Sequence, residues 1–287
     1  MNSRPLKELL PRGVRRRLGA ARRWLRARPR RTRRQKEALL AAGGLSAAER
    51  TLLDGVESRI HYDDGMYKGD GAHYFKVGLD AVRCIEEALA AARLIEPRAI
   101  LDLPCGYGRV LRFLGARFPA ARVTACELMP EAVRFCAETF GAIPAQSAYD
   151  FDALTLDVRY DLIWCGSLVT HLDAARTGAL LRFFARTLAP GGLLLFTTHG
   201  EFVAGRVQAM HEFYGLNPAD IPALVASFRE TGHGYLDYPE GPGYGVSLTA
   251  PDWLRARARE IGDLREVYFR AQGWDRHQDV FGFVKQS

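Results

Sequence analysis

Two carboxylates and two glycines form the first group of residues whose spacing indicates chemistry. The segment AILDLPCGYGRVL, residues 99–111, ends an apolar run at Asp102 and then turns through Gly106 and Gly108. Glycine lets a backbone approach a ligand closely, because it tolerates unusual dihedral angles and has no Cβ. Glu127 ends the next apolar run, where a carboxylate can accept hydrogen bonds from both hydroxyls of a ribose. The pattern predicts a loop that binds a nucleoside-containing cofactor.

The glycines do not complete the dinucleotide-binding fingerprint. In G-x-G-x-x-G the third glycine permits close packing of the helix on the strand, whereas this chain has Leu111 at that position. The sequence therefore disfavours a nicotinamide-dependent dehydrogenase. Asp102 instead suits a cofactor whose positively charged amino-acid end lies over the glycine loop.

Alternating strands and helices must position these residues. The strand-like runs are residues 99–103, 122–127, 160–166 and 191–198, and the helical runs between them are 108–118, 130–140 and 173–189. This alternation predicts a mostly parallel sheet covered by helices on both faces. Ligands of such sheets lie outside the carboxyl ends of the strands, which is where both carboxylates stand. Two further strand-like runs, 264–274 and 277–285, predict a closing hairpin.

Four segments of the chain resemble, in order and spacing, the motifs of a known family. The segments ILDLPCGYGRV, VTACELMPEAV, YDLIWCGSLVTHL and LAPGGLLLFTTHG are similar to those of class I S-adenosylmethionine-dependent methyltransferases, over roughly residues 98–200. The resemblance implies an α/β fold: a Rossmann-like, doubly wound, seven-stranded sheet, mostly parallel with an antiparallel C-terminal strand, here with added N-terminal helices. Pro104 stands where the family's loop commonly has glycine, so this turn is expected to be stiffer.

The resemblance also implies S-adenosylmethionine as the cofactor and a set of residues that bind it. From the methionine end to the ribose, the adenine and the methyl group, the set is Asp102, Gly106, Gly108, Glu127, Leu128, Met129, Ser147, Gly166 and Ser167. Ser147 begins a Ser-Ala-Tyr segment where the family often has Gly-Asp, so the expected acid near the adenine amine is missing.

Two histidines are the candidate catalytic residues. Methyl transfer from a sulfonium depends mainly on in-line positioning, and a base is needed only for a hydroxyl or a protonated amine. His171 follows the strand at 160–166, and His199 ends the strand at 191–198, both on the cofactor side. His199 is the first choice, because it precedes the segment expected to cover the acceptor. A purely structural histidine is the alternative in each case.

Residues 201–244 are expected to form much of the acceptor pocket. Their mixture of aromatic faces and polar tips suits a sugar or another polyhydroxylated acceptor, although an aromatic surface patch would have the same composition. The candidate acceptor-binding residues are His211, Tyr214, Tyr238 and Tyr244. The predicted acceptor is a small molecule or a glycan, methylated on a hydroxyl. No metal site is expected, because the cysteines and histidines lack metal-ligand spacing.

The charge of the chain is unevenly distributed. The 287 residues carry a formal net charge of +7, but residues 1–36 hold 15 Lys and Arg against the single acid Glu8. The rest of the chain therefore has 25 basic and 32 acidic residues. Such a segment is expected to contact an anionic membrane surface or nucleic acid. A solvated arm and an Arg-rich presequence are the alternatives.

Cysteine usage and hydropathy indicate the compartment. The five cysteines include no C-x-x-C pair, and an odd number without a secretory signal argues for free thiols in a reducing compartment. No apolar run approaches the ~20 residues that span a bilayer. We expect a cytoplasmic protein, with peripheral membrane contact as an option and an oligomeric state that the sequence does not indicate.

The sequence thus predicts three parts: a basic Arg-rich tail at 1–36, an N-terminal helical extension at 37–97, and a methyltransferase domain at 98–287 with an acceptor-binding insertion at 201–244. The predicted function is transfer of a methyl group from S-adenosylmethionine to a small-molecule or glycan hydroxyl. The alternatives are an RNA methyltransferase docked by the basic tail and a catalytically inactive cofactor-binding scaffold.

Overall fold

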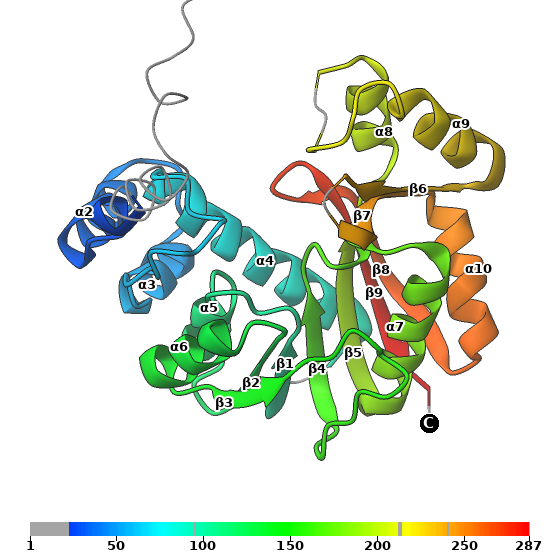
Figure 1. The fold of residues 1–287 in the computed structure, drawn as a ribbon. Coiled ribbons are helices and arrows are strands. Elements are labelled where there is room, and N and C mark those ends of the chain that lie inside the picture. Colours follow the sequence, from blue (N-terminus) through cyan, green and yellow to red (C-terminus); the bar gives the residue numbers. More distant parts are fainter. Residues whose placement is uncertain (1–22, 95, 212–213, 240, 287) are drawn as a thin grey trace, which may run out of the picture. The chain divides into compact units, whose positions relative to one another are not determined.

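The computed structural model describes residues 23–94, 96–211, 214–239 and 241–286 (Figure 1). The chain divides into two compact units, residues 1–76 and 77–287. The boundaries expected from composition, 36/37 and 97/98, remain predictions. The position 36/37 falls inside helix α2 (Pro29–Ala41), and helix α4 (Gly71–Ala92) begins in the first unit and continues into the second.

The described residues of the first unit, 23–76, include the helices α2 and α3 and the start of α4. Helix α3 (Ala47–Gly55) begins with a capping box, in which the Ser46 side chain accepts from the Glu49 backbone and the Glu49 carboxylate accepts from the Ser46 backbone. Lys36 of α2 is buried and donates to the carbonyl oxygens of Asp54 and Val56, both at 2.8 Å. This amine binds the last carbonyls of α3 and so joins the two helices.

The second unit contains a seven-stranded sheet in the order β3–β2–β1–β4–β5–β9–β8. The strands are β1 (Ala99–Asp102), β2 (Arg122–Glu127), β3 (Ile143–Gln146), β4 (Tyr160–Cys165), β5 (Leu188–Thr198), β8 (Leu264–Trp274) and β9 (Gln278–Lys285). The first five pair in parallel, and β9 is antiparallel to both β5 and β8. The predicted fold class is confirmed. Strand β3 has no counterpart among the runs picked out above, because its four residues include Pro144 and none is fully buried.

Helices cover both faces of this sheet (Figure 1). They are α4, α5 (Leu111–Arg117), α6 (Pro130–Phe140), α7 (Ala174–Thr187) and α10 (Pro251–Ile261), with a short 3-10 turn, η2 (Val169–His171). Successive strand residues alternate between two hydrophobic clusters: Leu162 and Trp164 belong to one, Ile163 and Cys165 to the other. Because strand side chains point alternately to opposite faces, the two clusters are the two layers of the core.

The insertion after β5 forms a small subdomain of its own. It consists of α8 (Glu201–Gln208), α9 (Ile221–Thr231) and an antiparallel hairpin of β6 (His233–Tyr238) and β7 (Gly241–Thr249). Its core contains Val203, Phe228 and Leu248. The hairpin extends to Thr249, beyond the expected end of the insertion at residue 244. In Figure 1 this subdomain lies beyond the carboxyl ends of β4 and β5, and the Thr249 N–H donates to the His199 carbonyl at 2.8 Å.

Candidate active site

The candidate site lies at one edge of the sheet, where the parallel strands end. Strand β1 pairs with β2 on one side and β4 on the other, so the strand order reverses beside β1. Asp102 ends β1, Glu127 ends β2, and His199 directly follows β5. A reversal of this kind opens a crevice outside the carboxyl ends of the strands, which is where ligands bind.

Asp102 is a buried carboxylate with one oxygen that has no partner among the described residues. The residue is 1% exposed, its Oδ2 makes no hydrogen bond, and the carboxylate accepts from the backbone of Leu111. Burial raises the pKa of Asp102 well above its usual range and the nearby Glu127 raises it further, whereas Arg109 and the Leu111 bond lower it. A buried acceptor without a donor is costly, so Oδ2 suits a ligand that brings a charged donor.

The two glycines of the loop have different functions. Both have positive φ, +50° at Gly106 and +79° at Gly108, a region that favours glycine. A Cβ at Gly106 would meet no atom within 4 Å, so the loop is open on that side. A Cβ at Gly108 would lie 2.5 Å from the ring of Phe140 in α6. Gly106 therefore allows a ligand to approach, and Gly108 allows the loop to pack on α6.

Backbone groups hold Glu127 in position at the end of β2. Its Oε2 accepts from the Gly106 N–H at 3.0 Å, and its Oε1 accepts from the Leu128 N–H at 2.7 Å. The Gln146 amide donates to the carbonyls of Glu127 and Leu128. The carboxylate thus joins the ends of β1 and β2. Leu128 and Met129 beside it are 37% and 46% exposed, which provides apolar surface of the kind that an adenine ring covers.

The remaining predicted cofactor residues lie at the ends of β3 and β4. Ser147 is buried and its backbone N–H donates to the Glu127 carbonyl at 3.0 Å. Gly166 packs against the Trp274 ring, since a Cβ there would lie 2.9 Å from it. Ser167 has a φ of +64° and donates its N–H to the Thr197 hydroxyl at 2.8 Å.

Sequence reasoning missed Thr197 and Gln278 at this edge. The Gln278 side-chain amide donates to the Ser167 hydroxyl at 2.9 Å, and its carbonyl oxygen accepts from Thr197. The two strands that carry them are neighbours, with Thr198 of β5 opposite Asp279 of β9. An antiparallel last strand begins at the edge where the parallel strands end. The polar pair His277–Gln278 directly before an apolar run was therefore the sequence signal that could have placed these residues at this edge.

His199 is buried and uncharged at this edge. It is 3% exposed, and burial lowers its pKa to about 3, with smaller contributions from His171 and His277. A hydrogen bond with the backbone of Ser247 acts in the opposite direction. Its Nδ1 has no hydrogen-bond partner among the described residues. At neutral pH the ring is therefore a neutral imidazole with Nδ1 available to accept a hydrogen bond.

Tyr214 and His277 both lie beside His199 and also contact each other. The Tyr214 hydroxyl lies 2.5 Å from His277 Nε2, and the ring centroids of Tyr214 and His277 lie 5.0 Å and 5.8 Å from that of His199. Tyr214 was a candidate from sequence, whereas His277 was not. His277 belongs to the turn between β8 and β9. The antiparallel pairing of β9 with β5 brings this turn to the end of β5.

His171 belongs to a second aromatic group, formed with the hairpin. Its Nδ1 lies 2.7 Å from the Gly245 carbonyl and 3.2 Å from the Tyr238 hydroxyl, and its ring stacks on Tyr244 at 4.7 Å. Burial lowers the pKa of His171, and the Gly245 bond opposes this. Burial, Tyr238 and then Glu127 raise the pKa of Tyr244 to about 12. His171 therefore attaches the hairpin to η2. Tyr244 of this hairpin lies close enough to Glu127 for the carboxylate to raise the pKa of the tyrosine.

His211 is exposed just after α8. In the part of the chain that the structure describes, its imidazole makes no hydrogen bond or ring contact with His199, Tyr214 or His277. The four acceptor candidates are thus divided, with Tyr214 beside His199, Tyr238 and Tyr244 beside His171, and His211 beside neither.

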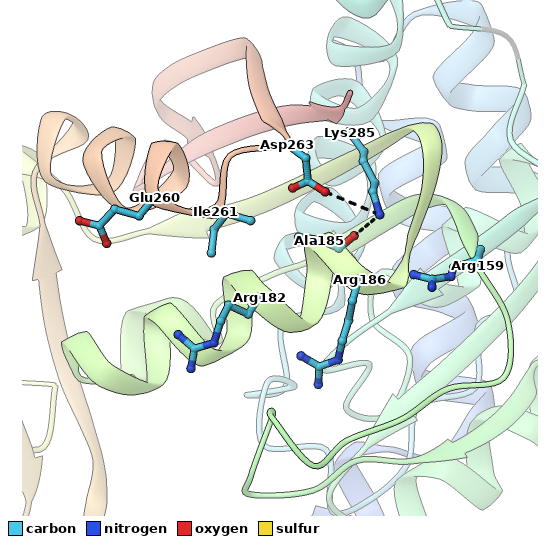
Figure 2. A pocket seen from close by; sticks show the side chains of 8 residues that line it. All are labelled: Arg159, Arg182, Ala185, Arg186, Glu260, Ile261, Asp263 and Lys285. Atoms are coloured by element: carbon cyan, nitrogen blue, oxygen red, sulfur yellow. Dashed lines mark hydrogen bonds and ion pairs between the residues drawn. The ribbon is translucent and has the colours of Figure 1, made fainter. Parts of the chain in front are cut away.

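A pocket of about 440 Å³ lies at the opposite edge of the sheet (Figure 2). Its lining consists of Arg159, Arg182, Ala185, Arg186, Glu260, Ile261, Asp263 and Lys285. Arg182 pairs with Asp152, and Lys285 donates to the Ala185 carbonyl at 2.6 Å. Because Arg159 precedes β4 and Lys285 ends β9, this pocket lies away from Asp102, Glu127 and His199, and we place the chemistry at the other edge.

Part of the chain matches known proteins in sequence and in fold. Residues 101–194 match a protein family described as a methyltransferase domain. In fold, the chain is similar to an S-adenosylmethionine-dependent methyltransferase from Clostridium acetobutylicum, with a TM-score of 0.53 and 14% identity over 74% of this chain and 92% of that one. Residues 101–194 therefore match a methyltransferase domain, and the fold around them is similar to that of a known S-adenosylmethionine-dependent methyltransferase.

Curated relatives of this methyltransferase domain have different acceptors in their names. A trans-aconitate 2-methyltransferase from Methylobacterium nodulans is 29% identical over 129 residues, which are 45% of this chain and 49% of that protein. A malonyl-[acyl-carrier protein] O-methyltransferase from Halalkalibacterium halodurans is 30% identical over 159 residues, 52% of this chain and 57% of that protein. The chain spans about half the length of the curated relatives it matches.

The residues of the methyltransferase domain fit S-adenosylmethionine. The unpartnered Oδ2 of Asp102 suits the ammonium of the methionine part, the open side of Gly106 leaves room for its backbone-like atoms, and Glu127 stands at the ribose position. Among the described residues there is no group of three or more potential metal ligands and no helix long and apolar enough to cross a membrane.

Proposed function

We propose that the protein is an active methyltransferase that methylates a hydroxyl of a small-molecule or glycan acceptor bound beside His199. The observation that carries this proposal is the buried, neutral imidazole of His199 with an unpartnered Nδ1, at the same sheet edge as Asp102 and Glu127. A group of this kind accepts the hydrogen bond of an acceptor hydroxyl and turns an oxygen lone pair toward the cofactor.

The cofactor half of the site would hold its ligand through few groups. Asp102 would bind the ammonium of the methionine part, Glu127 the ribose hydroxyls, and the exposed side chains of Leu128 and Met129 the adenine. When bound, S-adenosylmethionine supplies an electrophilic methyl group. Because Glu127 is already fixed by the N–H groups of Gly106 and Leu128, this part of the site is preorganised.

The acceptor half would orient the nucleophile and receive its proton. A pKa of about 3 makes His199 a weak base toward a free hydroxyl. A hydroxyl oxygen that has gained a methyl group is a far stronger acid than an imidazolium, so Nδ1 can still take its proton. The Tyr214–His277 pair would fix the rest of the acceptor by hydrogen bonds. The lowered pKa values of His171 and His199 favour neutral rings, which suits an uncharged, hydroxyl-bearing acceptor.

A second candidate is an acid as acceptor, and the names of the relatives favour it. Trans-aconitate and malonyl groups both carry carboxylates, which are nucleophiles that need no general base. In that case His199 would only donate or accept a positioning hydrogen bond. The two candidates differ in the product, an ether in one case and an ester in the other.

The cofactor assignment is tested by calorimetric titration of the full chain with S-adenosylmethionine, S-adenosylhomocysteine and NAD. We expect micromolar binding of the two adenosyl ligands alone. Glu127→Ala should weaken it at least tenfold (~1.4 kcal/mol), whereas Glu131→Ala, an exposed acid at the start of α6, should not. Binding of NAD, or of no ligand by a folded sample, would contradict the proposal.

The acceptor class is tested with S-adenosylmethionine labelled in the methyl group and a panel of sugars, phenols and dicarboxylic acids. Label in a product that survives mild alkali indicates an ether. Label released as methanol indicates an ester and would replace the first candidate with the second. His199→Gln should slow ether formation ~10²–10⁴-fold, and retention of full activity by this variant would remove His199 from the reaction.

A further inference from the structure

The first unit presents a basic surface that the methyltransferase reaction does not explain. Residues 23–36 contain eight Arg and Lys and no acid. The chain is helical at residues 23–26 and again in α2. Of these cations Lys36 is buried and binds the carbonyls of Asp54 and Val56. The arginines of this stretch are all exposed.

One side of this segment is buried in the protein. Ala27, Thr32, Lys36 and Leu39 are buried, and they recur at intervals of three to five residues. Arg28, Arg30 and Arg34 lie between them and are exposed. The helical segment therefore has a buried side and a basic outer side, so its charges serve a purpose other than filling the core.

Exposed apolar side chains accompany these arginines. Trp24 is 53% exposed, Leu25 49%, Tyr62 38% and Met66 55%. Two contacts join the helical residues to the loop that carries the other pair: Arg23 pairs with Asp63 at 3.0 Å, and the Tyr67 hydroxyl donates to the Arg26 carbonyl at 3.2 Å. We call Trp24, Leu25, Tyr62 and Met66, with the exposed arginines of residues 23–34, the basic-apolar patch.

We propose that the basic-apolar patch binds the anionic surface of a lipid bilayer. Arginines are attracted to acidic headgroups, Trp and Tyr suit the interfacial region, and Leu and Met suit the adjoining acyl region. Stable peripheral membrane binding requires two contributions, and this patch offers both positive charge and apolar area. Residues 1–22 contribute seven further Lys and Arg against Glu8 in the sequence. The acceptor would then be reached at a membrane surface.

The apolar members of the patch favour lipid over RNA. Binding of single-stranded RNA depends on flat aromatic faces for base stacking, but the Arg28 guanidinium lies over the Trp24 ring at 4.6 Å from its centroid. Leu25 and Met66 offer no aromatic face at all. A purely electrostatic site for nucleic acid gains nothing from either side chain, whereas an interfacial site does.

The test is co-sedimentation of the full chain with vesicles of phosphatidylcholine alone and with ~30% phosphatidylglycerol. We expect binding to the anionic vesicles only, weakened by salt. Trp24→Ala with Leu25→Ala should reduce the partition coefficient ~10-fold. The matched control is Val158→Ala with Met210→Ala, two exposed side chains of the second unit, which should leave binding unchanged.

Other outcomes would overturn the proposal. They are equal binding by the Trp24/Leu25 variant, absence of binding to either vesicle, and tighter binding to a labelled single-stranded RNA than to anionic vesicles at the same salt concentration. Arg30→Glu with Arg34→Glu tests the charge separately and should likewise weaken sedimentation with anionic vesicles. Circular dichroism and cofactor titration of each variant verify that the protein remains folded.

Discussion

The loop of Asp102 and the surroundings of His199 share one sheet edge but are assembled differently. Asp102, Gly106 and Glu127 come from two adjacent strands, and the backbone of Gly106 is bound directly to Glu127. Around His199 the groups come from four separate places: the end of β5, the segment after α8, the hairpin and the turn before β9. The first region is determined mainly by local backbone geometry, and the second by packing of distant segments.

This difference predicts how each region responds to mutation. A change in the cofactor loop should alter binding of the adenosyl ligand with little effect on acceptor chemistry. A change around His199 should do the reverse. The experiments below separate the two regions, beginning with the largest expected effect.

His199→Gln should reduce kcat ~10²–10⁴-fold, the usual contribution of a positioned base, while the Kd for S-adenosylmethionine stays within about twofold. His171→Gln is the contrast, because His171 binds the hairpin backbone at Gly245. It should lower thermal stability and raise KM more than it lowers kcat. Steady-state kinetics and calorimetry check both. An equal loss of cofactor affinity in His199→Gln would break the comparison.

Gly108→Ala should lower the free energy of unfolding by ~2–3 kcal/mol, through backbone strain at φ +79° and overlap with Phe140. Gly106→Ala should cost only ~1 kcal/mol, since its Cβ meets nothing within 4 Å. It should nevertheless weaken cofactor binding at least tenfold. Urea unfolding and calorimetry measure the two effects. A larger stability loss at Gly106 than at Gly108 would contradict the functions assigned to the two glycines.

The pH dependence of stability isolates His199 from the cofactor carboxylate. Below pH 6.5 the unfolded chain binds a proton at this histidine, whereas the folded protein, with a pKa of about 3, does not. The contribution of His199 is therefore lost as pH falls from 6.5 toward 3. Asp102 acts in the opposite direction because its folded pKa is raised.

Asp102 is present in both wild type and His199→Gln, so its contribution cancels in the difference between their free energies of unfolding. It should shrink by ~1.4 kcal/mol per pH unit between pH 6 and pH 4. Urea unfolding at several pH values measures this slope, and a difference that is independent of pH would mean that His199 is charged in the folded state.

The smallest effect is expected at the tyrosines. Tyr214→Phe removes the hydroxyl that binds His277 and should lower kcat/KM ~10-fold, about the value of one buried hydrogen bond. Tyr238→Phe, whose hydroxyl lies 3.2 Å from His171 Nδ1, should change it less than threefold. Kinetics at saturating cofactor checks the order, and a reversed order would assign the acceptor to the His171 group.

From the sequence alone follow the fold class, which the structure confirms, and the common sheet edge of Asp102 and Glu127. Asp102 and Glu127 each close an apolar run, and in a parallel sheet the ends of such runs share one edge whatever the rest of the chain does. The helix at 130–140 is found at the residues expected, because Pro130 begins it and Gly141 ends it with a φ of +68°. These are local signals, and they can be read without knowledge of distant contacts.

Only the tertiary structure decided what surrounds the histidines. Strand β3 was missed because its short, half-buried pattern depends on pairing with β2. His277 and Gln278 reached the site because β9 runs antiparallel, which places its first residues beside the last residues of β5. The low pKa of His199 follows from burial beneath the hairpin and from neighbouring histidines, and both arise from segments that are remote in sequence. Long-range packing, which no local pattern encodes, separates the acceptor side from the cofactor loop.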